Sequence, residues 1–329
     1  MDGSMDGFVP QVCVPVLDTL IMVTGLVGHS LVIIILAGRW RRGRQLPHGT
    51  DSLLLGLSAT DLLLLSCLPF HTTAIALGQW PFGSFLCKTV SFLGVACSSA
   101  SVFTLVALAV SRYVIVVHPT LAYRSRMQRS FHVAPVALWV PALALAAPQF
   151  AFRTVSSSTQ LACFAFLSDL SQLMYSTALF LITFAIPLII IAAMYAKIYC
   201  FLRDTRQGCR TSHLLRYQSQ VTHTSVLLVL VFMACWLPSY ILMFLLVGKT
   251  VSNAPGYRAF GIFVRLLASS ASVANPILYV FNSTKFRKDL LQVGRESYGA
   301  FRKCCRRHPR GGNAVQPFHP MVLGPPLHQ

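Results

Sequence analysis

The chain alternates long apolar stretches with short polar segments. Seven of the apolar stretches reach about 20 residues or more, the length at which a helix crosses the hydrocarbon core of a bilayer. They are residues 14–38, 51–77, 86–117, 131–150, 173–202, 219–247 and 259–281. No motif recurs at a fixed period, so neither a solenoid nor a duplicated transporter half is indicated. The pattern predicts an all-α membrane protein: a bundle of seven transmembrane helices with a short amphipathic eighth helix.

Composition and charge support this reading. Of the 329 residues, 55% are hydrophobic and 11% are charged, whereas soluble domains carry about 25% charged residues. The formal net charge is +18, but 20 of the 27 Lys and Arg residues fall on one side of the predicted spans and four on the other. Cytoplasmic loops of membrane proteins carry this excess. The split predicts an extracellular N-terminus and a cytoplasmic C-terminus, and it explains the charge without nucleic acid.

The polar segments suggest four parts. These are an extracellular N-terminus (1–13), the seven-helix domain (14–281), the amphipathic helix (282–295) and a disordered basic cytoplasmic tail (296–329). The first ten residues hold two acids and no Lys or Arg, unlike the start of a signal peptide. In the tail, Cys304 and Cys305 follow the amphipathic stretch, which suits S-palmitoylation. Two free reduced thiols are the alternative.

Asp61 is the only acid that the pattern places deep in the bundle. An ionisable side chain inside a span is costly and is therefore a functional candidate. Ser101, Ser272 and Asn275 lie on other spans at similar depth and offer oxygen ligands. We interpret these four residues as a small cation site, for sodium or a proton. The alternative is a buried carboxylate that only hydrogen-bonds its neighbours.

Prolines lie inside several of the spans. Pro238 follows Trp236 in mid-span, and a proline removes a backbone hydrogen bond and kinks a helix. A Trp beside a kink is well placed to couple a pocket to the bend. A lipid-facing Trp is the alternative, although such residues favour the membrane interfaces. Proline and tyrosine also occur together in the fifth and seventh spans, as Pro187 with Tyr195 and Pro276 with Tyr279.

The cysteines on the outer side predict a disulfide. Cys87 lies at the outer end of the third span, and Cys163 lies in the loop between the fourth and fifth spans. Both map to the oxidising side of the membrane, where disulfides persist. We expect a Cys87–Cys163 bond that holds the loop over the mouth of the bundle, with Cys13 as partner of neither.

Motifs typical of enzymes do not occur in the sequence. It has no Gly-rich phosphate loop, no His-Glu-x-x-His and no Cys-x-x-Cys pair, and no recognisable nucleophile setting. We therefore expect no enzymatic activity, and no cofactor apart from an ion at Asp61.

Together these residues resemble the rhodopsin-like (class A) G-protein-coupled receptors, over about residues 14–295. Single motifs of this kind are weak, including Arg112, which alone would suggest a snorkelling anchor at a helix end. The ordered set is specific. It comprises Leu57-Ser58-Ala59-Thr60-Asp61, Cys87, Arg112, Trp139, Pro187, Tyr195, Cys235-Trp236-Leu237-Pro238, Asn275-Pro276-x-x-Tyr279 and Phe286.

Within that class, the segments 68–70, 80–83 and 86–88 resemble the peptide receptors of the galanin, kisspeptin and somatostatin type. Gly94 stands where amine receptors carry an ammonium-binding Asp, so a monoamine ligand is not expected. Ser269 stands where opsins carry the retinal Lys, which excludes a light receptor.

The resemblance implies a plasma-membrane receptor that binds an extracellular peptide, activates a heterotrimeric G protein and then binds arrestin. An agonist would shift the population between two states through its differential affinity for them. The kink in the sixth span would relax and open a cytoplasmic cleft. The residues implied in this switch and in coupling are Arg112, Tyr113, Tyr195, Trp236, Pro238, Asn275, Pro276 and Tyr279.

The resemblance also implies a ligand pocket in the outer part of the bundle. Arg265 lies ten residues before Asn275, about 15 Å toward the outside at 1.5 Å per residue. An unpaired guanidinium there would be costly. It either meets an anionic group of the ligand, which we favour, or pairs with an outer acid, for which Asp169 is the best candidate. The implied pocket residues are His71, Trp236, Tyr240 and Arg265.

Three features depart from the family pattern. His29 replaces the Asn of the first span, and Ser111 replaces the acid that pairs with the neighbouring Arg. The only Asn-x-Ser/Thr sequon begins at Asn282, on the cytoplasmic side, where it cannot be glycosylated. The loss of the acid at Ser111 predicts raised basal activity.

Three alternatives stay open. A transporter or channel would need a polar path or inverted repeats with broken helices, and the sequence shows neither. A non-signalling relative would act as a partner protein. Within the receptors, Arg265 also suits a lipid or a small organic acid as ligand.

Overall fold

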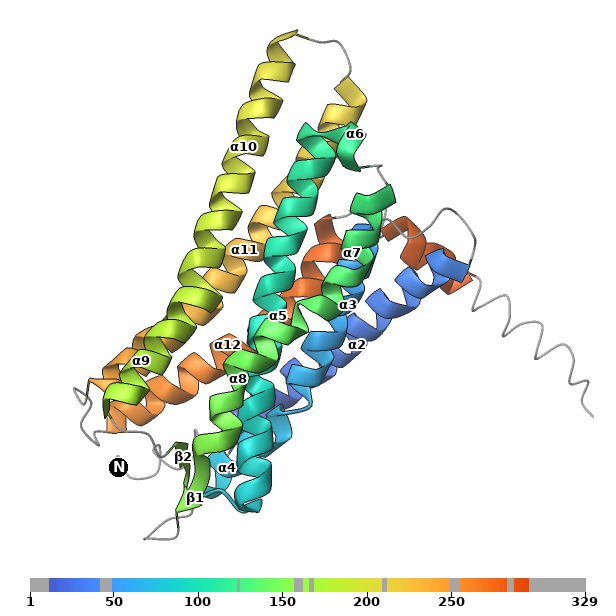
Figure 1. The fold of residues 1–329 in the computed structure, drawn as a ribbon. Coiled ribbons are helices and arrows are strands. Elements are labelled where there is room, and N and C mark those ends of the chain that lie inside the picture. The colour runs from blue at the N-terminus through green and yellow to red at the C-terminus, as the bar shows by residue number, and fades with distance from the viewer. Residues whose placement is uncertain are drawn as a thin grey trace, which may run out of the picture.

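The predicted bundle of transmembrane helices is confirmed. A computed structural model describes residues 12–41, 49–122, 125–156, 162–165, 169–208, 212–248, 255–282 and 287–295. Within these residues, seven helical segments are long and apolar enough to cross a membrane. They pack side by side, with a short β-hairpin at one end of the bundle (Figure 1).

Each predicted span corresponds to one helix or to a run of helices, and α6 is a short extra turn after the third span. In chain order the elements are α2 (Val14–Arg41), α3 (Gly49–Leu65), α4 (Leu68–Leu77), α5 (Gly83–Val117), α6 (Pro119–Ala122), α7 (Ser125–Ala137), α8 (Trp139–Phe152), β1 (Arg153–Ser156), β2 (Ala162–Ala165), α9 (Asp169–Phe180), η3 (Leu181–Ala185), α10 (Ile186–Gly208), α11 (Ser212–Val247) and α12 (Pro255–Asn282).

The second span is divided into α3 and α4 because Pro69 cannot donate a backbone hydrogen bond. Just before it, the Cys67 N–H bonds to the Leu64 carbonyl at 3.1 Å, a tighter turn than an α-helix makes. At the other end of α4, Gly78 has a φ of 67°, the left-handed conformation with which helices often end. The break aims the first turns of α4 at the neighbouring helix α2.

The fifth span changes its helical pitch before Pro187. Leu181–Ala185 form π-helical turns, and the Ile186 N–H bonds to the Leu181 carbonyl. Such wide turns are rare in proteins as a whole, and those that do occur are often found at functional sites. Here they carry Thr183 and Phe184, both of which are buried.

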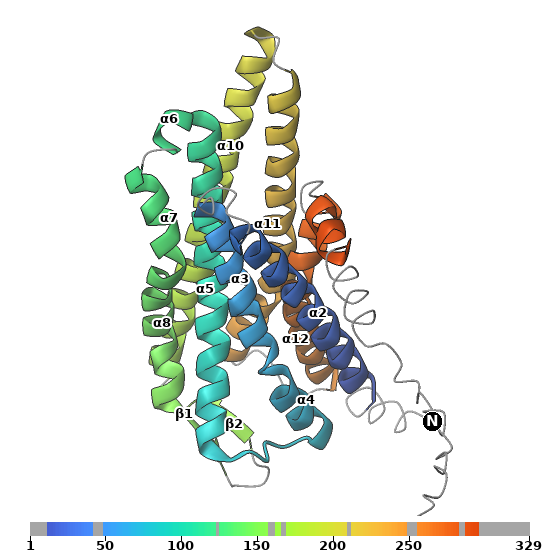
Figure 2. The same ribbon diagram turned by 90° about the vertical axis from the view of Figure 1, so that its right-hand side faces the viewer.

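The third span, α5, lies in the middle of the bundle (Figures 1 and 2). Fourteen of its 35 residues are buried. Its inward side chains join apolar residues of α2, α3, α10 and α11, whereas Leu20, Val140 and Ile189 on the perimeter are more than half exposed, as suits a surface covered by lipid. The core cluster is Val32, Ile35, Leu36, Leu53, Leu57, Leu105, Leu108, Ala109, Ile191 and Val229.

The hairpin is the part of the described fold that is not helical. β1 and β2 pair antiparallel, with Arg153 opposite Ala165 and Val155 opposite Cys163. Cys163 forms a disulfide with Cys87 in the first turns of α5, so the predicted bond is confirmed and Cys13 carries a free thiol. We refer to this end of the bundle as the hairpin end.

The eighth helix is represented by residues 287–295, which are helical. They lie at the end opposite the hairpin. The Asp289 carboxylate forms an ion pair with Arg39 and accepts a hydrogen bond from its Nε at 2.7 Å, and Leu290 and Val293 pack against the core cluster. Residues 283–286 and the tail, including Cys304 and Cys305, lie outside the described residues.

Candidate functional site

A cavity of about 560 Å³ opens near the hairpin end. Its walls are mostly apolar, with a few polar groups, which is the usual composition of a ligand pocket. All four residues that the sequence placed in the pocket line it: His71, Trp236, Tyr240 and Arg265. The structure thus brings these four residues together, from α4, α11 and α12, around one cavity; their role in binding a ligand stays a prediction.

One wall of the cavity is aromatic. The Tyr240 hydroxyl lies 2.6 Å from the Thr183 hydroxyl, and its ring contacts Phe180 and Phe184 at centroid separations of 5.6 and 5.1 Å. The π-helical turns of η3 thus bring Thr183 to the cavity and hold Tyr240 by its polar end. The Phe180 and Phe184 rings pack against the Tyr240 ring and help to fix its position in the cavity wall.

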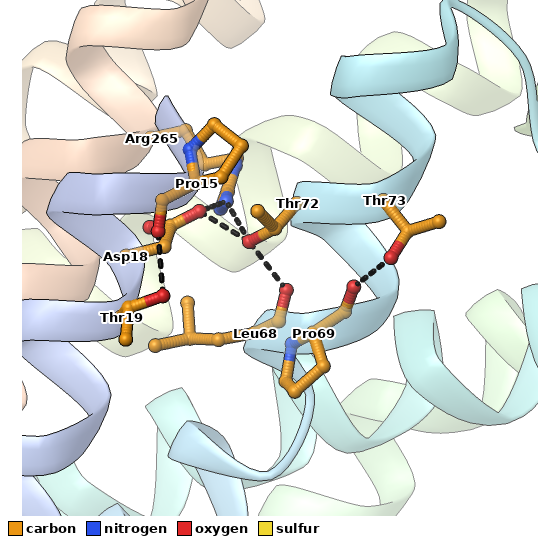
Figure 3. A network of polar contacts seen from close by, with 8 residues as sticks. All are labelled: Pro15, Asp18, Thr19, Leu68, Pro69, Thr72, Thr73 and Arg265. Carbon is orange, nitrogen blue, oxygen red and sulfur yellow. Dashed lines mark hydrogen bonds and ion pairs between the residues drawn. The ribbon is translucent and has the colours of Figure 1, made fainter. Parts of the chain in front are cut away.

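Arg265 does not stand alone in the cavity wall. Its Nη2 donates hydrogen bonds to an Asp18 carboxylate oxygen on α2 and to the Thr72 hydroxyl on α4, the latter at 3.3 Å (Figure 3). Thr72 also contacts the same carboxylate oxygen. The acid that neutralises Arg265 is Asp18, so the sequence-based choice of Asp169 is wrong.

This network leaves some of its polar atoms without a partner. Asp18 has 3% of its surface exposed, and its Oδ1 has no hydrogen-bond partner among the described residues. The same holds for the Nε and Nη1 of Arg265. The pair therefore neutralises the charge of Arg265 but does not use all of its donors.

A second guanidinium, which the sequence analysis did not single out, also lines the cavity. Arg153, the first residue of β1, donates from Nε to the Gln149 side-chain oxygen at 2.8 Å and from Nη1 to the Cys163 carbonyl at 3.3 Å. Gln149 donates to the Tyr175 hydroxyl, which itself donates to a backbone carbonyl of α8. Burial lowers the pKa of Arg153 below its ordinary value.

A smaller cavity of about 20 Å³ lies deeper, beside Asp61. The Asp61 carboxylate accepts hydrogen bonds from Asn275 at 2.5 Å and from Ser101 at 3.3 Å. Ser272 lines the same space. The structure thus brings together all four residues predicted for a cation site. Trp236 lines both this cavity and the larger one.

His29 lies next to the four residues around Asp61. It is fully buried, with its Nε2 2.7 Å from the Ser272 carbonyl and 3.5 Å from an Asp61 oxygen. Its Nδ1 has no hydrogen-bond partner among the described residues. A neutral imidazole with the proton on Nε2 fits this geometry, because it leaves an acceptor rather than a charged donor unsatisfied. His29, one of the residues that differ from the family pattern, therefore lies at the candidate ion site.

At the opposite end of the bundle lie three of the residues predicted for coupling, Arg112 and Tyr113 on α5 and Tyr195 on α10. The Ser111 hydroxyl donates to the Leu108 carbonyl of its own helix at 2.8 Å, so its proton is not directed at Arg112. The Tyr113 hydroxyl lies 3.4 Å from the His118 Nε2. The Lys197 ammonium lies over the Tyr113 ring, 5.7 Å from the ring centroid. Tyr195 packs against the core cluster.

The prolines of the last two spans lie inside continuous helices. Pro238 is within α11 and Pro276 within α12. Pro276 is buried against α2 at Gly28, where an added Cβ would lie 2.7 Å from the proline ring. The side chain of Tyr279 lies outside the described part of the structure.

Two relevant residues escaped the sequence analysis for identifiable reasons. Asp18 lies near the outer end of the first span, where an acid suggests the water interface. Arg153 follows the fourth span immediately and suggests a loop cation. The sequence did contain a signal for both residues. Each is a charged residue that lies outside the basic segments expected on the cytoplasmic side. Their burial depends on packing between helices, which a single sequence does not report.

Comparison with known proteins identifies the family. Residues 28–279 match the model of the 7 transmembrane receptor (rhodopsin family). The chain is similar to somatostatin receptor type 5 of Rattus norvegicus, with 32% identity over 88% of this chain and 80% of that receptor. It is also similar to galanin receptor type 1 of Homo sapiens, with 32% identity over 83% and 79%.

A third relative is the allatostatin-A receptor of Bombyx mori, 30% identical over 83% of this chain and 77% of that receptor. The family consists of signalling receptors rather than enzymes, and these relatives belong to its peptide-receptor branch. The matched residues 28–279 run from the middle of the first span to Tyr279 near the end of the last, and they contain the motifs that suggested the resemblance apart from Phe286. This chain belongs to the rhodopsin family of seven-transmembrane receptors.

Proposed function

We propose that the protein is a plasma-membrane receptor that binds an extracellular peptide in the larger cavity and activates a heterotrimeric G protein. The observation that carries this proposal is the cavity itself. It is apolar, has an aromatic wall and two guanidinium groups, and opens beside the disulfide-linked hairpin. The hairpin end faces outside, and the basic loops at the other end face the cytoplasm.

Relatives that are named for peptides support the ligand class. At the cytoplasmic end, Arg112, Tyr113 and Tyr195 lie on the helices that the family uses for coupling, and Tyr279 belongs with them by sequence. Arrestin is the expected second partner at that surface. Cys304 and Cys305 are the proposed sites of palmitoylation, which would fix the tail to the inner leaflet.

The test is nucleotide exchange on a panel of Gα proteins in cells that express the receptor. The ligands are a peptide collection that includes somatostatin, galanin and allatostatin-A. The matched variant is Gly94→Trp, because Gly94 lines the cavity and a Cβ there meets no atom within 4 Å, so the larger side chain would occupy the cavity. We expect peptide-dependent exchange in the parent and its loss in the variant, with basal exchange retained.

Two results contradict the proposal. One is a response to lipids or small organic acids with none to peptides, which would favour the alternative ligand class. The other is surface expression with no exchange under any condition, which would favour a non-signalling partner.

We further propose that the small cavity binds sodium in the resting state. Asp61, Ser101 and Asn275 offer the oxygen atoms that hard cations prefer, and the cavity has room for about one water-sized occupant. The residues therefore fit such an ion. His29 is its competitor, since the imidazole lies 3.5 Å from the Asp61 carboxylate.

Sodium should then lower the affinity of a peptide agonist. Asp61→Asn should abolish this sensitivity, and His29→Asn should increase it, because the neutral amide replaces the competing ring. Agonist binding measured in sodium and in potassium checks both variants. Equal binding in the two salts for the parent and for His29→Asn would contradict the site.

A further inference from the structure

The larger cavity contains two cationic side chains that differ in how their charges are balanced. Arg265 is paired with Asp18, and Thr72 completes that contact. The carboxylate is nearly fully buried, so it stays with Arg265 rather than being screened by water. A ligand that approaches Arg265 meets a neutral pair.

Arg153 is held by neutral groups. Its two bonds go to the Gln149 amide oxygen and the Cys163 carbonyl. Within the part of the chain that the structure describes, no carboxylate lies within ion-pair distance of it. The two bonds orient the guanidinium but leave its full positive charge in the cavity wall. A guanidinium has five N–H donors, and the Nη2 amino group of Arg153 has no protein acceptor among the described residues.

We propose that Arg153, rather than Arg265, recognises an anionic group of the ligand, and that this group is a carboxylate of the peptide. A carboxylate forms bidentate, charge-assisted hydrogen bonds with a guanidinium. The partners of Arg153 resist its reorientation, because Gln149 is anchored to Tyr175 and Cys163 is anchored by the disulfide. The Arg153 side chain is thus largely ordered before the ligand binds, so binding costs little further side-chain entropy.

The same arrangement assigns a different role to Arg265. Its charge is matched by Asp18, and its unpartnered Nε and Nη1 are buried and expose almost no surface to a ligand. Arg265 therefore presents neither an unbalanced charge nor an accessible unpaired Nε or Nη1. The cavity discriminates by charge at Arg153. This inference rests on the proposed peptide-binding function and specifies which end of the cavity receives the charged group.

The first experiment uses a small probe and needs no known agonist. The thermal unfolding of the purified receptor is measured with N-acetylphenylalanine and with its amide, which share a phenyl ring for the apolar walls and differ in one charge. We expect the carboxylate to raise the melting temperature more than the amide does. This preference should disappear in Arg153→Gln.

The control variant is Asp18→Asn with Arg265→Gln, which removes the neutral pair without changing the net charge. It should retain the preference for the carboxylate. If the control loses the preference while Arg153→Gln retains it, the assignment is overturned. If Arg153→Gln does not fold, Arg153→Lys decides: its point charge should weaken the preference several-fold, and an unchanged preference would overturn the proposal.

A second experiment separates this inference from the peptide function. Somatostatin and galanin are each synthesised with a free C-terminal carboxylate and with an amide, and nucleotide exchange is measured in cells. The carboxylate form should be at least tenfold more potent, and Arg153→Gln should equalise the two. If neither peptide activates the parent in either form, support for the peptide function falls, while the melting-temperature comparison still decides the role of Arg153.

Discussion

Asp18 lies in the second turn of the first transmembrane helix, yet its carboxylate is almost completely buried against Arg265 and Thr72. Two opposite charges enter this apolar region together. Each makes the burial of the other tolerable, because an isolated charge there would cost several kcal/mol. The contact joins α2, α4 and α12, so it stabilises the hairpin end as well as setting the charge of the cavity.

The pair leads to a prediction about stability. Asp18→Asn should destabilise the receptor by up to about 3 kcal/mol, because it leaves the Arg265 charge without its partner. Adding Arg265→Gln should restore much of the loss. Thr72→Val is the matched comparison and should cost about 1 kcal/mol, the value of one hydrogen bond. Thermal unfolding in detergent measures all three, and a double variant no more stable than Asp18→Asn would contradict the pairing.

At the scale of elements, the close approach of α2 and α12 depends on the absence of a side chain at Gly28. A Cβ there would lie 2.7 and 2.8 Å from two ring carbons of Pro276, closer than carbon atoms pack. Both helices also contribute to the cluster around Asp61, through His29 and Asn275. Their spacing therefore affects the packing of the bundle and the small cavity together.

Gly28→Ala should consequently destabilise the receptor by about 1–3 kcal/mol, the cost of overpacking a dense interface. Gly94→Ala is the control. A methyl group there meets no atom within 4 Å, and alanine favours a helix by up to about 1 kcal/mol over glycine. Equal melting temperatures for the two variants would show that α2 and α12 adjust freely.

Much of this architecture was predictable, and the exceptions share a cause. The spans and the Cys87–Cys163 bond follow from hydropathy and local charge, because a bilayer restricts the length and polarity of the segments that cross it. The residues around Asp61 and the cavity were found because they are unusual inside a membrane. The π-helical turns before Pro187, the partner of Arg265 and the burial of Arg153 were missed. Each of these depends on the register between helices, which one sequence does not encode locally.

At the scale of the whole molecule, the proposed function divides ligand binding and coupling between the two ends of the bundle. We predict a resting state that is weakly held at the end opposite the hairpin. Family members carry an acid beside Arg112, and this chain has Ser111, whose hydroxyl proton is donated to Leu108. A neutral side chain that bonds within its own helix does not restrain a guanidinium as a carboxylate would.

Basal signalling should therefore be measurable in cells without ligand. Ser111→Asp should lower it about fivefold, since about 1 kcal/mol of extra resting-state stability shifts the equilibrium by that factor. Ser111→Ala should leave it unchanged, because it removes only the bond to Leu108. Nucleotide exchange without agonist measures both. If Ser111→Asp matches the parent, another group supplies the restraint.

The hairpin has one more consequence. Cys163 provides both a sulfur to the disulfide and the carbonyl that receives the Arg153 Nη1. Anything that opens the bond releases the strand that aims this guanidinium, while the apolar bundle below remains packed. A membrane-impermeant reductant should thus weaken recognition of acidic ligands before it unfolds the receptor. The protein would then respond to the redox potential of its surroundings as well as to the concentration of its ligand.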